Sequence, residues 1–213
     1  MKSFKIVIVD YEMGNIRSIE NAIRHAGYEN LEVSSSKEVI HSADCLILPG
    51  VGAFPDAMQS LREKALIEPL NDAVLVQKKP VLGICLGMQL LFELSEEKGI
   101  TQGLGWIPGK VEYMNPGHNF RVPHIGWNSL LVKPNDSLFG FLNHDKDFYF
   151  VHSLHAKCDE KFILSEFDYG VRMVAAVKKE NVVGMQFHPE KSQKNGLLAM
   201  RSFLKWAAMS TGL

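Results

Sequence analysis

Pro80-Val81-Leu82-Gly83-Ile84-Cys85-Leu86-Gly87 is predicted to be a short apolar strand that ends in a sharp turn at a cysteine. Glycines stand close to Cys85 on both sides, where side chains would collide with adjacent backbone. The run Met88-Gln89-Leu90-Leu91-Phe92 follows, and we expect it to continue as a helix. The pattern therefore predicts a nucleophile elbow, a strand-to-helix turn that displays a reactive side chain.

Strand and helix patterns alternate on the N-terminal side of this turn. Short apolar runs at 4–9, 31–33, 45–48 and 80–84 predict strands. A helical pattern over 16–26 stops at Gly27, and Ser36 can cap a brief helix through Val39 and Ile40. Apolar strands separated by helices imply a parallel sheet covered on both faces.

The C-terminal half predicts mainly strands, at 110–114, 127–132, 147–153, 162–167, 174–177 and 182–187. Turn signals at 115–117, 134–136 and 179–181 suggest hairpins, and an apolar period near 3.6 over 197–207 predicts a closing helix. We therefore expect one three-layer α/β domain over residues 1–213. Its central sheet would be mostly parallel, with antiparallel extensions in the C-terminal half.

The composition indicates an ordinary globular protein, since 46% of the 213 residues are hydrophobic and 22% are charged. A net charge of -1 gives no electrostatic footprint for nucleic acid. The apolar run at 4–9 is too short for a signal peptide or a membrane span. The three cysteines, Cys45, Cys85 and Cys158, are odd in number and have no paired spacing. We therefore expect no disulfide framework and a location in the reducing cytoplasm. We expect Cys45 in the core and Cys158 in a loop.

Cys85 differs from the other cysteines in its context. A helix N-terminus favours a thiolate by roughly 0.3–1 kcal/mol. The amide of Leu86 would point to where an oxyanion forms, and one such donor is worth about 10²–10³ in rate. Glycines flank many strand-to-helix turns, however, so these five residues alone do not separate a catalytic cysteine from a buried thiol.

A base for Cys85 is predicted in His188-Pro189-Glu190. His188 follows the strand at 182–187, and open α/β sheets bind ligands at the carboxyl ends of their strands. Residues two apart in an extended chain point the same way, so Glu190 can reach the same region. A thiol nucleophile needs a base, and the base needs an acceptor that orients its ring. We therefore expect Cys85, His188 and Glu190 to form a catalytic triad.

The other histidines give no comparable pattern. We expect four of them on the solvated surface: His25, His41, His118 and His144. His152-x-x-His155 has the spacing of a possible metal pair, but a strand would put the two side chains on opposite faces. No carboxylate or cysteine cluster completes such a site, so we expect no metal and no other cofactor.

These residues resemble the class I, or triad, glutamine amidotransferases, over nearly the whole chain. The pattern is Gly83-x-Cys85-x-Gly87, then Gln89, then His188-Pro189-Glu190. The loop Pro49-Gly50-Val51-Gly52 resembles the branch of glutaminases that serve a (β/α)₈ cyclase. Further stretches match that branch: Asp10-Tyr11-x-Met13-Gly14-Asn15, Pro123-His124-Ile125-Gly126-Trp127-Asn128, Tyr149-Phe150-Val151-His152-Ser153 and His188-Pro189-Glu190-Lys191-Ser192.

The resemblance implies hydrolysis of L-glutamine through a thioester on Cys85. The amides of Val51 and Leu86 would form the oxyanion hole, with the Val51 peptide turning inward when the partner holds its substrate. Gly50 and Gly52 suit that movement, because a loop flanked by glycines can reorient a peptide at low cost. Glutamine would be held by four residues, through the Gln89 side chain and through backbone: Gly52, Gln89, Ser153 and Leu154.

The implied partner is a (β/α)₈ cyclase subunit that receives the ammonia for histidine biosynthesis. A dry conduit between the subunits would keep ammonia neutral and nucleophilic. The family positions at this junction are matched by five residues: Asn15, His124, Trp127, Tyr149 and Lys191.

Two residues depart from the branch. Glu12 stands where glycine is common and Ile125 where methionine is usual. Both lie near the expected partner face, so a paralogous pair that amidates bacterial surface sugars is an alternative. A stand-alone thiol hydrolase and a regulatory module with an inactive site are further alternatives, which Gln89 and the intact triad disfavour.

Overall fold

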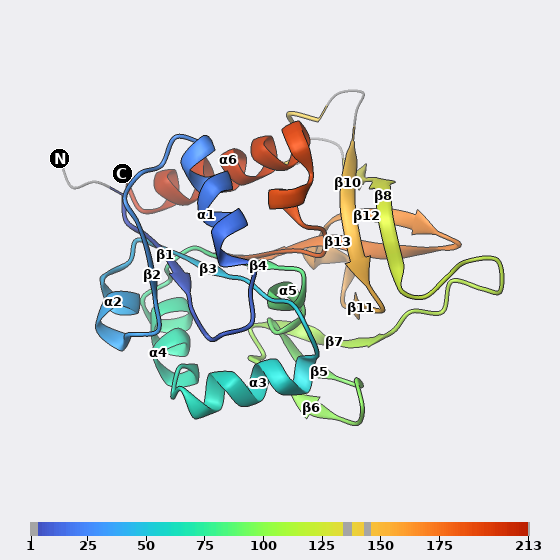
Figure 1. Cartoon of the computed structure of the whole chain (residues 1–213), viewed down its shortest axis with the longest axis horizontal. Coiled ribbons are helices and arrows are strands. Elements are labelled where there is room, and N and C mark those ends of the chain that lie inside the picture. Colours follow the sequence, from blue (N-terminus) through green and yellow to red (C-terminus); the bar gives the residue numbers. More distant parts are fainter. Residues whose placement is uncertain (1–3, 134–137, 143–145, 213) are drawn as a thin grey trace.

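A mostly parallel sheet forms the centre of the computed structural model, which describes residues 4–133, 138–142 and 146–212 (Figure 1). Its first five strands in spatial order are parallel, and the remaining three join antiparallel. This arrangement confirms the expected fold class. The order is β2 (Leu31–Ser34), β1 (Ile6–Val9), β3 (Cys45–Leu48), β4 (Val81–Ile84), β14 (Val182–Met185), β13 (Val171–Lys179), β12 (Ile163–Tyr169) and β9 (Leu131–Val132).

Helices cover both faces of the parallel part. On one face lie α1 (Ile16–His25) and α6 (Gln193–Ser210); on the other lie α2 (Lys37–Ser42), α3 (Phe54–Glu63) and α4 (Ile67–Asn71) (Figure 1). Alternate residues of β1 serve the two faces, because side chains alternate along a strand. Ile6 and Ile8 join the core under α1 and α6, whereas Val7 and Val9 join the core on the opposite face. Each fully buried aliphatic side chain stabilises the fold by about 1.5–3 kcal/mol.

Local signals set the ends of these helices much as predicted. Gly27 follows α1 with a φ of 96°, and Ser36 Oγ accepts a hydrogen bond from the Val39 N–H at 3.4 Å at the start of α2. Cys45 is buried in β3, as expected. The described residues also form a π-helix (Asp72–Val76) and two 3₁₀ turns (Glu160–Phe162 and Pro189–Lys191). No helix in the described ranges is long and apolar enough to span a membrane.

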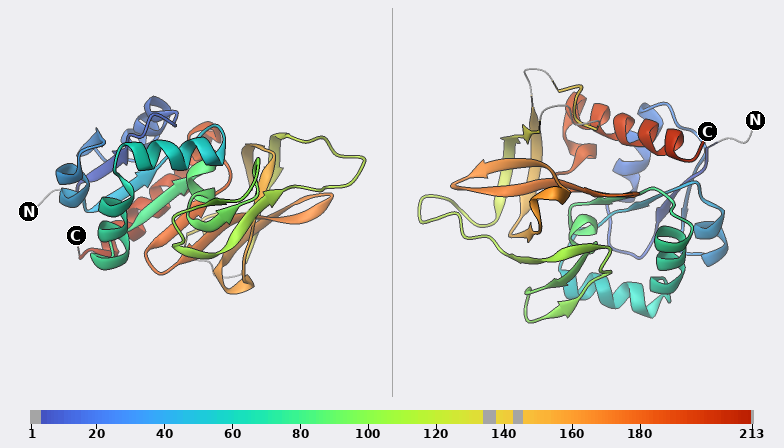
Figure 2. Two further views of the ribbon diagram at one scale, coloured as in Figure 1. Left: turned by 90° about the horizontal axis from the view of Figure 1, so that it is seen from below. Right: turned by 180° about the vertical axis from the view of Figure 1, so that it is seen from behind.

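Two smaller sheets extend the C-terminal half. β8 (His124–Ser129) pairs antiparallel with β10 (Asp147–His152). β11 (Leu154–Lys157), β7 (Ile107–Tyr113), β5 (Phe92–Ser95) and β6 (Thr101–Gln102) form the other sheet. Figures 1 and 2 show β8 and β10 projecting away from the helical layers, with the connection between β7 and β8 reaching furthest.

Several expected elements differ in extent from the structure, and two of these differences change the type or the number of elements. The helix after Cys85, α5 (Leu86–Gln89), has four residues and does not continue through Phe92, because Phe92 starts β5 and pairs with Ile107 of β7. The run at 127–132 is divided between β8 and β9, which belong to different sheets. The predicted turn at 179–181 does form the β13–β14 hairpin, whereas the turn at 134–136 lies outside the described residues.

Glycines allow the ends of β3 and β4 to meet at the elbow. A Cβ on Gly87 would lie 1.9 Å from the Leu48 carbonyl oxygen, and a Cβ on Gly83 would lie 2.5 Å from the Gly87 oxygen. A Cβ on Gly50 would lie 2.5 Å from the Gly87 nitrogen. The loop after β3 is therefore held against the turn that carries Cys85.

We predict that Gly87→Ala will lower the free energy of unfolding by on the order of 3 kcal/mol or more, because rigid backbone cannot yield to the added methyl group. Gly105→Ala is the matched control, since Gly105 has a φ of 68° but no atom within 4 Å of an added Cβ. Its backbone strain should cost only about 1–2 kcal/mol. Urea unfolding of both variants measures the difference, and equal losses would contradict the close packing described at the elbow.

Candidate active site

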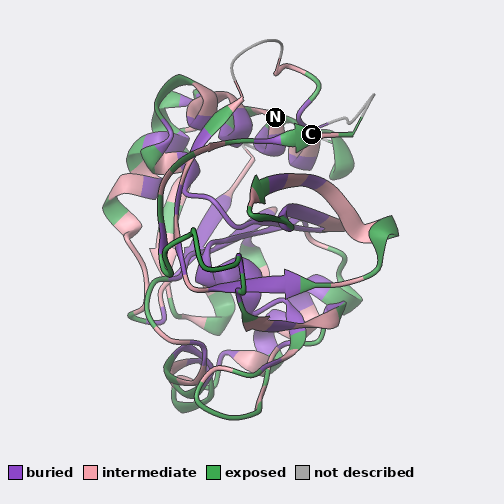
Figure 3. Ribbon diagram, turned by 90° about the vertical axis from the view of Figure 1, so that its right-hand side faces the viewer, coloured by how far each residue is buried: buried purple, intermediate pink, exposed green. Residues whose placement is uncertain are grey.

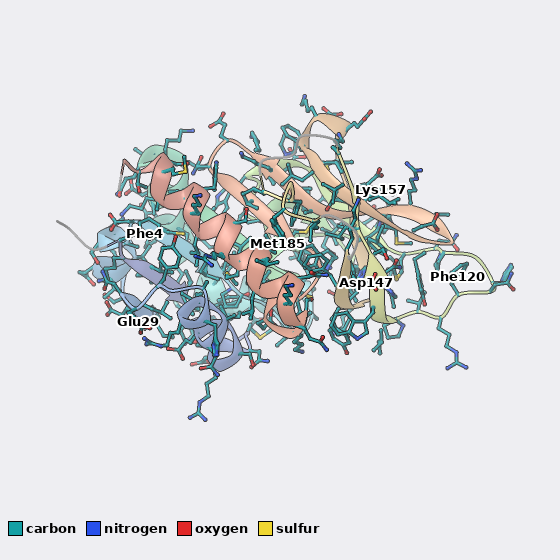
Figure 4. The ribbon with its side chains drawn as sticks, turned by 90° about the horizontal axis from the view of Figure 1, so that it is seen from above. Phe4, Glu29, Phe120, Asp147, Lys157 and Met185 are labelled. Atoms are coloured by element: carbon teal, nitrogen blue, oxygen red, sulfur yellow. The ribbon has the colours of Figure 1, made fainter. Side chains whose placement is uncertain are left out.

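Cys85 lies directly after β4 and is held by the neighbouring strand. Its N–H donates to the Met185 carbonyl at 2.8 Å, and Figure 4 labels Met185 beside helix α6. The cysteine has a φ of 54° and a ψ of -110°, a conformation that is strained for a residue with a side chain and clusters at functional sites. The helix α5 is only one turn long, so its dipole is weaker than that of the longer helix expected from the sequence. It therefore stabilises a thiolate less.

One pocket of about 300 Å³ collects most of the predicted site residues. Eight of them line it together with Val151 and His152: Val51, Gly52, Cys85, Leu86, Gln89, Ser153, Leu154 and His188. The polypeptide reaches this pocket from the ends of β3, β4 and β10 and from the residues after β14. Gly50 packs behind it against the elbow, and Glu190 contacts His188.

His188 and Glu190 form a buried pair. His188 Nδ1 donates to Glu190 Oε1 at 2.7 Å, and the two side chains are 2% and 1% exposed. His188 Nε2 has no hydrogen-bond partner among the described residues, and the ring lines the same pocket as Cys85. Burial lowers the pKa of His188, but its interactions with Cys85 and Glu190 outweigh burial and raise that pKa to about 10. The imidazole is therefore protonated at neutral pH when it faces a thiolate.

The backbone of His188 is fixed as firmly as its ring. Its N–H donates to the Tyr149 carbonyl at 2.9 Å, and its carbonyl accepts from Ser192 Oγ at 2.6 Å. Ser192 Oγ also accepts the Tyr149 N–H at 2.9 Å. These bonds connect the base to β10, one of the two strands of the projecting sheet.

The loop after β3 does not leave the Val51 N–H, a predicted oxyanion donor, free to bind a ligand. The Val51 N–H donates to the Met13 carbonyl at 3.0 Å, so it is not available to a ligand in this conformation. Gly52 has a φ of 107°, which permits backbone conformations that other residues avoid. Met13, as the acceptor for the Val51 N–H, was not predicted as a site residue, although it belongs to the matching stretch at 10–15.

Gln89 is bonded to the protein more completely than we expected of a substrate-binding side chain. It is 4% exposed, and Nε2 donates to the Leu154 carbonyl at 3.3 Å and to Gln186 Oε1 at 3.1 Å. Only Oε1 remains for a ligand, because an amide nitrogen has two hydrogens. Gln186 was not predicted from the sequence; its signal is a polar residue within the apolar run at 182–187.

His152 lines the pocket, and His124 packs behind it. His152 Nδ1 donates to the Leu154 carbonyl at 2.7 Å, and His124 Nδ1 lies 3.3 Å from His152 Nε2. Burial lowers the pKa of His152 to about 3, so its ring is neutral at physiological pH. His124 is 3% exposed, with ring centroids of Tyr169 and Phe167 at 4.0 and 5.4 Å. Its side chain is thus packed inside this chain and is not part of an exposed interface, because aromatic rings surround it.

The other predicted interface residues lie at or near the surface of the projecting sheet and α1. Trp127 is 47% exposed on β8, its ring 6.0 Å from that of Tyr149 on β10, and Lys191 Nζ lies 5.9 Å from the Tyr149 ring. Asn15 precedes α1 and is half-buried. Figure 3 views the molecule from the right-hand side of Figure 1, the side on which β8 and β10 project.

The two departures also lie in accessible places. Ile125 is 61% exposed on β8. Glu12 is exposed and forms an ion pair with Lys64 at 2.7 Å.

The remaining histidines have varied surroundings. His25 and His118 are exposed; His41 is partly buried and lies 3.1 Å from Asp72, so it is less solvated than expected; His144 lies outside the described residues. His155 is buried, with Nε2 3.7 Å from Glu112. Within the described residues, no group of three or more histidine, cysteine or acidic side chains could hold a metal ion.

The chain is similar to several proteins over almost its full length. It is 66% identical over 202 residues to the Vibrio vulnificus protein called imidazole glycerol phosphate synthase subunit HisH 2, covering 95% of this chain and 94% of the relative. It is 44% identical over 200 residues to imidazole glycerol phosphate synthase subunit HisH 1 of Campylobacter jejuni, covering 94% and 99%.

Solved structures share the fold at low identity. PurLQS of Thermotoga maritima has a TM-score of 0.72 at 22% identity, covering 97% of this chain and 99% of that one. The glutaminase domain of Trypanosoma brucei CTPS has a TM-score of 0.67 at 16% identity, covering 97% and 94%. The family described as glutamine amidotransferase class-I matches residues 7–205, and this chain belongs to that family.

Proposed function

We propose that this chain is the glutaminase subunit of an imidazole glycerol phosphate synthase, with residues 1–213 acting as one glutamine amidotransferase domain. The observation that carries the proposal is the shared pocket of Cys85, Gln89 and His188, with Glu190 bonded behind the imidazole. The 66% identity to a protein named as a HisH subunit of imidazole glycerol phosphate synthase supports the assignment to this enzyme.

The proposed reaction uses the charges of the buried triad. The Cys85 thiolate attacks the γ-carboxamide carbon of glutamine, and His188 gives a proton to the departing nitrogen as the carbon–nitrogen bond breaks. Ammonia leaves, and a γ-glutamyl thioester remains. Neutral His188 then takes a proton from water, which attacks the thioester and releases glutamate and the thiolate. Glu190 orients the ring and stabilises the imidazolium in both steps.

The oxyanion hole would be completed by a backbone movement. Leu86 follows the nucleophile and would supply one N–H, whereas the Val51 N–H must first leave the Met13 carbonyl. Gly50 and Gly52 flank the peptide that would turn. The substrate's α-amino and carboxylate groups would bind the backbone near Gly52, Ser153 and Leu154, with Gln89 Oε1 as a further acceptor.

The proposed partner is a (β/α)₈ cyclase subunit that forms a heterodimer with this chain in the cytoplasm. Trp127, Tyr149, Lys191 and Asn15 would contact it, while buried His124 supports β8 from within. Ammonia would pass across this junction and yield imidazole glycerol phosphate and aminoimidazole carboxamide ribotide. Docking has a chemical reason, because ammonia released to water would be protonated and lost as a nucleophile.

A glutaminase assay with candidate cyclases tests the function. We expect L-glutamine hydrolysis to rise when a histidine-pathway cyclase and its ligand are added, and Cys85→Ala to abolish glutamate formation because no thioester can form. A diazo-ketone analogue of glutamine should modify Cys85 in the wild type. Turnover that survives in Cys85→Ala would reject the mechanism, and stimulation only by a cyclase homologue from surface-sugar modification would move the protein to that pathway.

The charge state of His188 gives a second prediction. We expect histidine NMR to report a pKa of about 10 for His188 in the wild type. In Cys85→Ala this pKa should fall, since the interaction with the sulfur that raises it is gone. Because the folded pKa is raised, protonation of His188 stabilises the folded state. This stabilisation is complete below the unfolded pKa of about 6.5 and is lost as the pH rises through the folded pKa. An identical titration in both proteins would contradict the proposed ion pair.

The partner face gives a third prediction. Trp127→Ala should weaken binding to the cyclase by at least about 10-fold, as exposed aromatic side chains often dominate interfaces. Leu131→Ala is the control, because Leu131 is similarly exposed, at 42%, but lies on β9 at the edge of the central sheet. Isothermal titration calorimetry measures both, and equal effects would argue against β8 as the docking strand.

A further inference from the structure

A buried glutamine lies beside the nucleophile and has no role in the proposed reaction. Gln186 directly follows β14, is 0% exposed, and donates its backbone N–H to the Ala175 carbonyl at 2.8 Å. Its neighbours Met185 and Phe187 are buried apolar residues. A buried amide in such surroundings must be hydrogen-bonded, because leaving a buried polar group without a partner is costly.

The Leu154 carbonyl oxygen determines which way the oxygen and nitrogen of the Gln186 amide point. The Leu154 carbonyl only accepts, so the Gln89 group that faces it at 3.3 Å is the amide nitrogen. The same nitrogen lies 3.1 Å from the Gln186 side chain, which must therefore present Oε1. Gln186 Nε2 consequently points the other way, toward Cys85 Sγ at 3.8 Å. His152 Nδ1 also donates to the Leu154 carbonyl, which helps to hold that carbonyl in place.

The Gln186 donor opposes an unfavourable contact on the sulfur. The Val151 carbonyl lies 3.8 Å from Cys85 Sγ, and a carbonyl oxygen accepts from a thiol but repels a thiolate. The one-turn helix α5 provides little compensation. A hydrogen bond to an ionised acceptor is roughly twice as strong as one between neutral groups. The Gln186 N–H therefore favours the ionised sulfur over the protonated form.

We propose that Gln186 is a further catalytic residue, whose side-chain N–H stabilises the Cys85 thiolate, and that Gln89 is the positioning residue that fixes its amide. The hydrogen bond would assist both when the thiolate attacks and when it departs from the thioester. This catalytic consequence rests on the proposed glutaminase function, whereas the hydrogen bond to the sulfur does not.

The test compares alkylation of Cys85 by iodoacetamide, which needs an ionised sulfur but no glutamine site. Gln186→Met keeps the length and approximate volume of the side chain and removes the donor. We expect its alkylation rate near neutral pH to fall about tenfold, as one lost charge-assisted hydrogen bond predicts. The rate should converge with the wild type at alkaline pH, where the thiol is ionised in both proteins. Peptide mass spectrometry separates Cys85 from Cys45 and Cys158.

Met173→Leu is the matched control, because Met173 is 1% exposed on β13 of the same sheet and is not among the residues that line the pocket. Its alkylation profile should match the wild type. A Gln186→Met profile that superimposes on the wild type at every pH, in a protein with native thermal unfolding, would overturn the proposal. If Gln186→Met does not fold, Gln89→Met decides: it frees the Gln186 amide to turn, and an unchanged neutral rate would overturn the proposal equally.

Steady-state kinetics with the cyclase distinguish the two proposals. In Gln186→Met we expect kcat for glutamine to fall about tenfold, in line with the alkylation rate, while KM stays within about threefold. A wild-type complex without glutaminase activity would reject the proposed function, yet the alkylation profiles would still decide the hydrogen bond to the sulfur.

Discussion

The close contact between the end of β3 and the turn after β4 is the constraint on which the site depends. Gly87 lies so near the Leu48 carbonyl that no side chain fits between them, and Gly50 has the same relation to Gly87. This contact holds the loop that contains Val51 beside Cys85, so both residues line one pocket.

The polar groups around the sulfur form two branches that meet at Cys85. One branch is ionic, through His188 to buried Glu190. The other is neutral, through Gln186 and Gln89 to the Leu154 carbonyl and then His152. Low local dielectric strengthens both branches and makes any unpaired member costly.

The second branch also connects the pocket to the projecting sheet. His124 on β8 bonds His152 on β10, and the same strands carry Trp127 and Tyr149 on accessible positions. The His188 backbone is bonded to Tyr149 as well. A partner that docks on β8 and β10 would thus contact a strand that also lines the pocket, because Val151 and His152 of β10 are pocket residues. Coupling between docking and hydrolysis would need no long path through the core.

Local patterns in the sequence determined the parallel sheet, the elbow at Cys85 and the His188–Glu190 pair, since strand alternation, glycine spacing and a two-residue offset act over a few residues. Contacts between distant segments decided the rest. Whether the chain after Gln89 stays helical depends on β7, which pairs with Phe92, and whether His124 is exposed depends on Phe167 and Tyr169. The direction of the Gln186 amide likewise depends on the Leu154 carbonyl. Such partners lie tens of residues apart, and only folding brings their atoms within bonding distance.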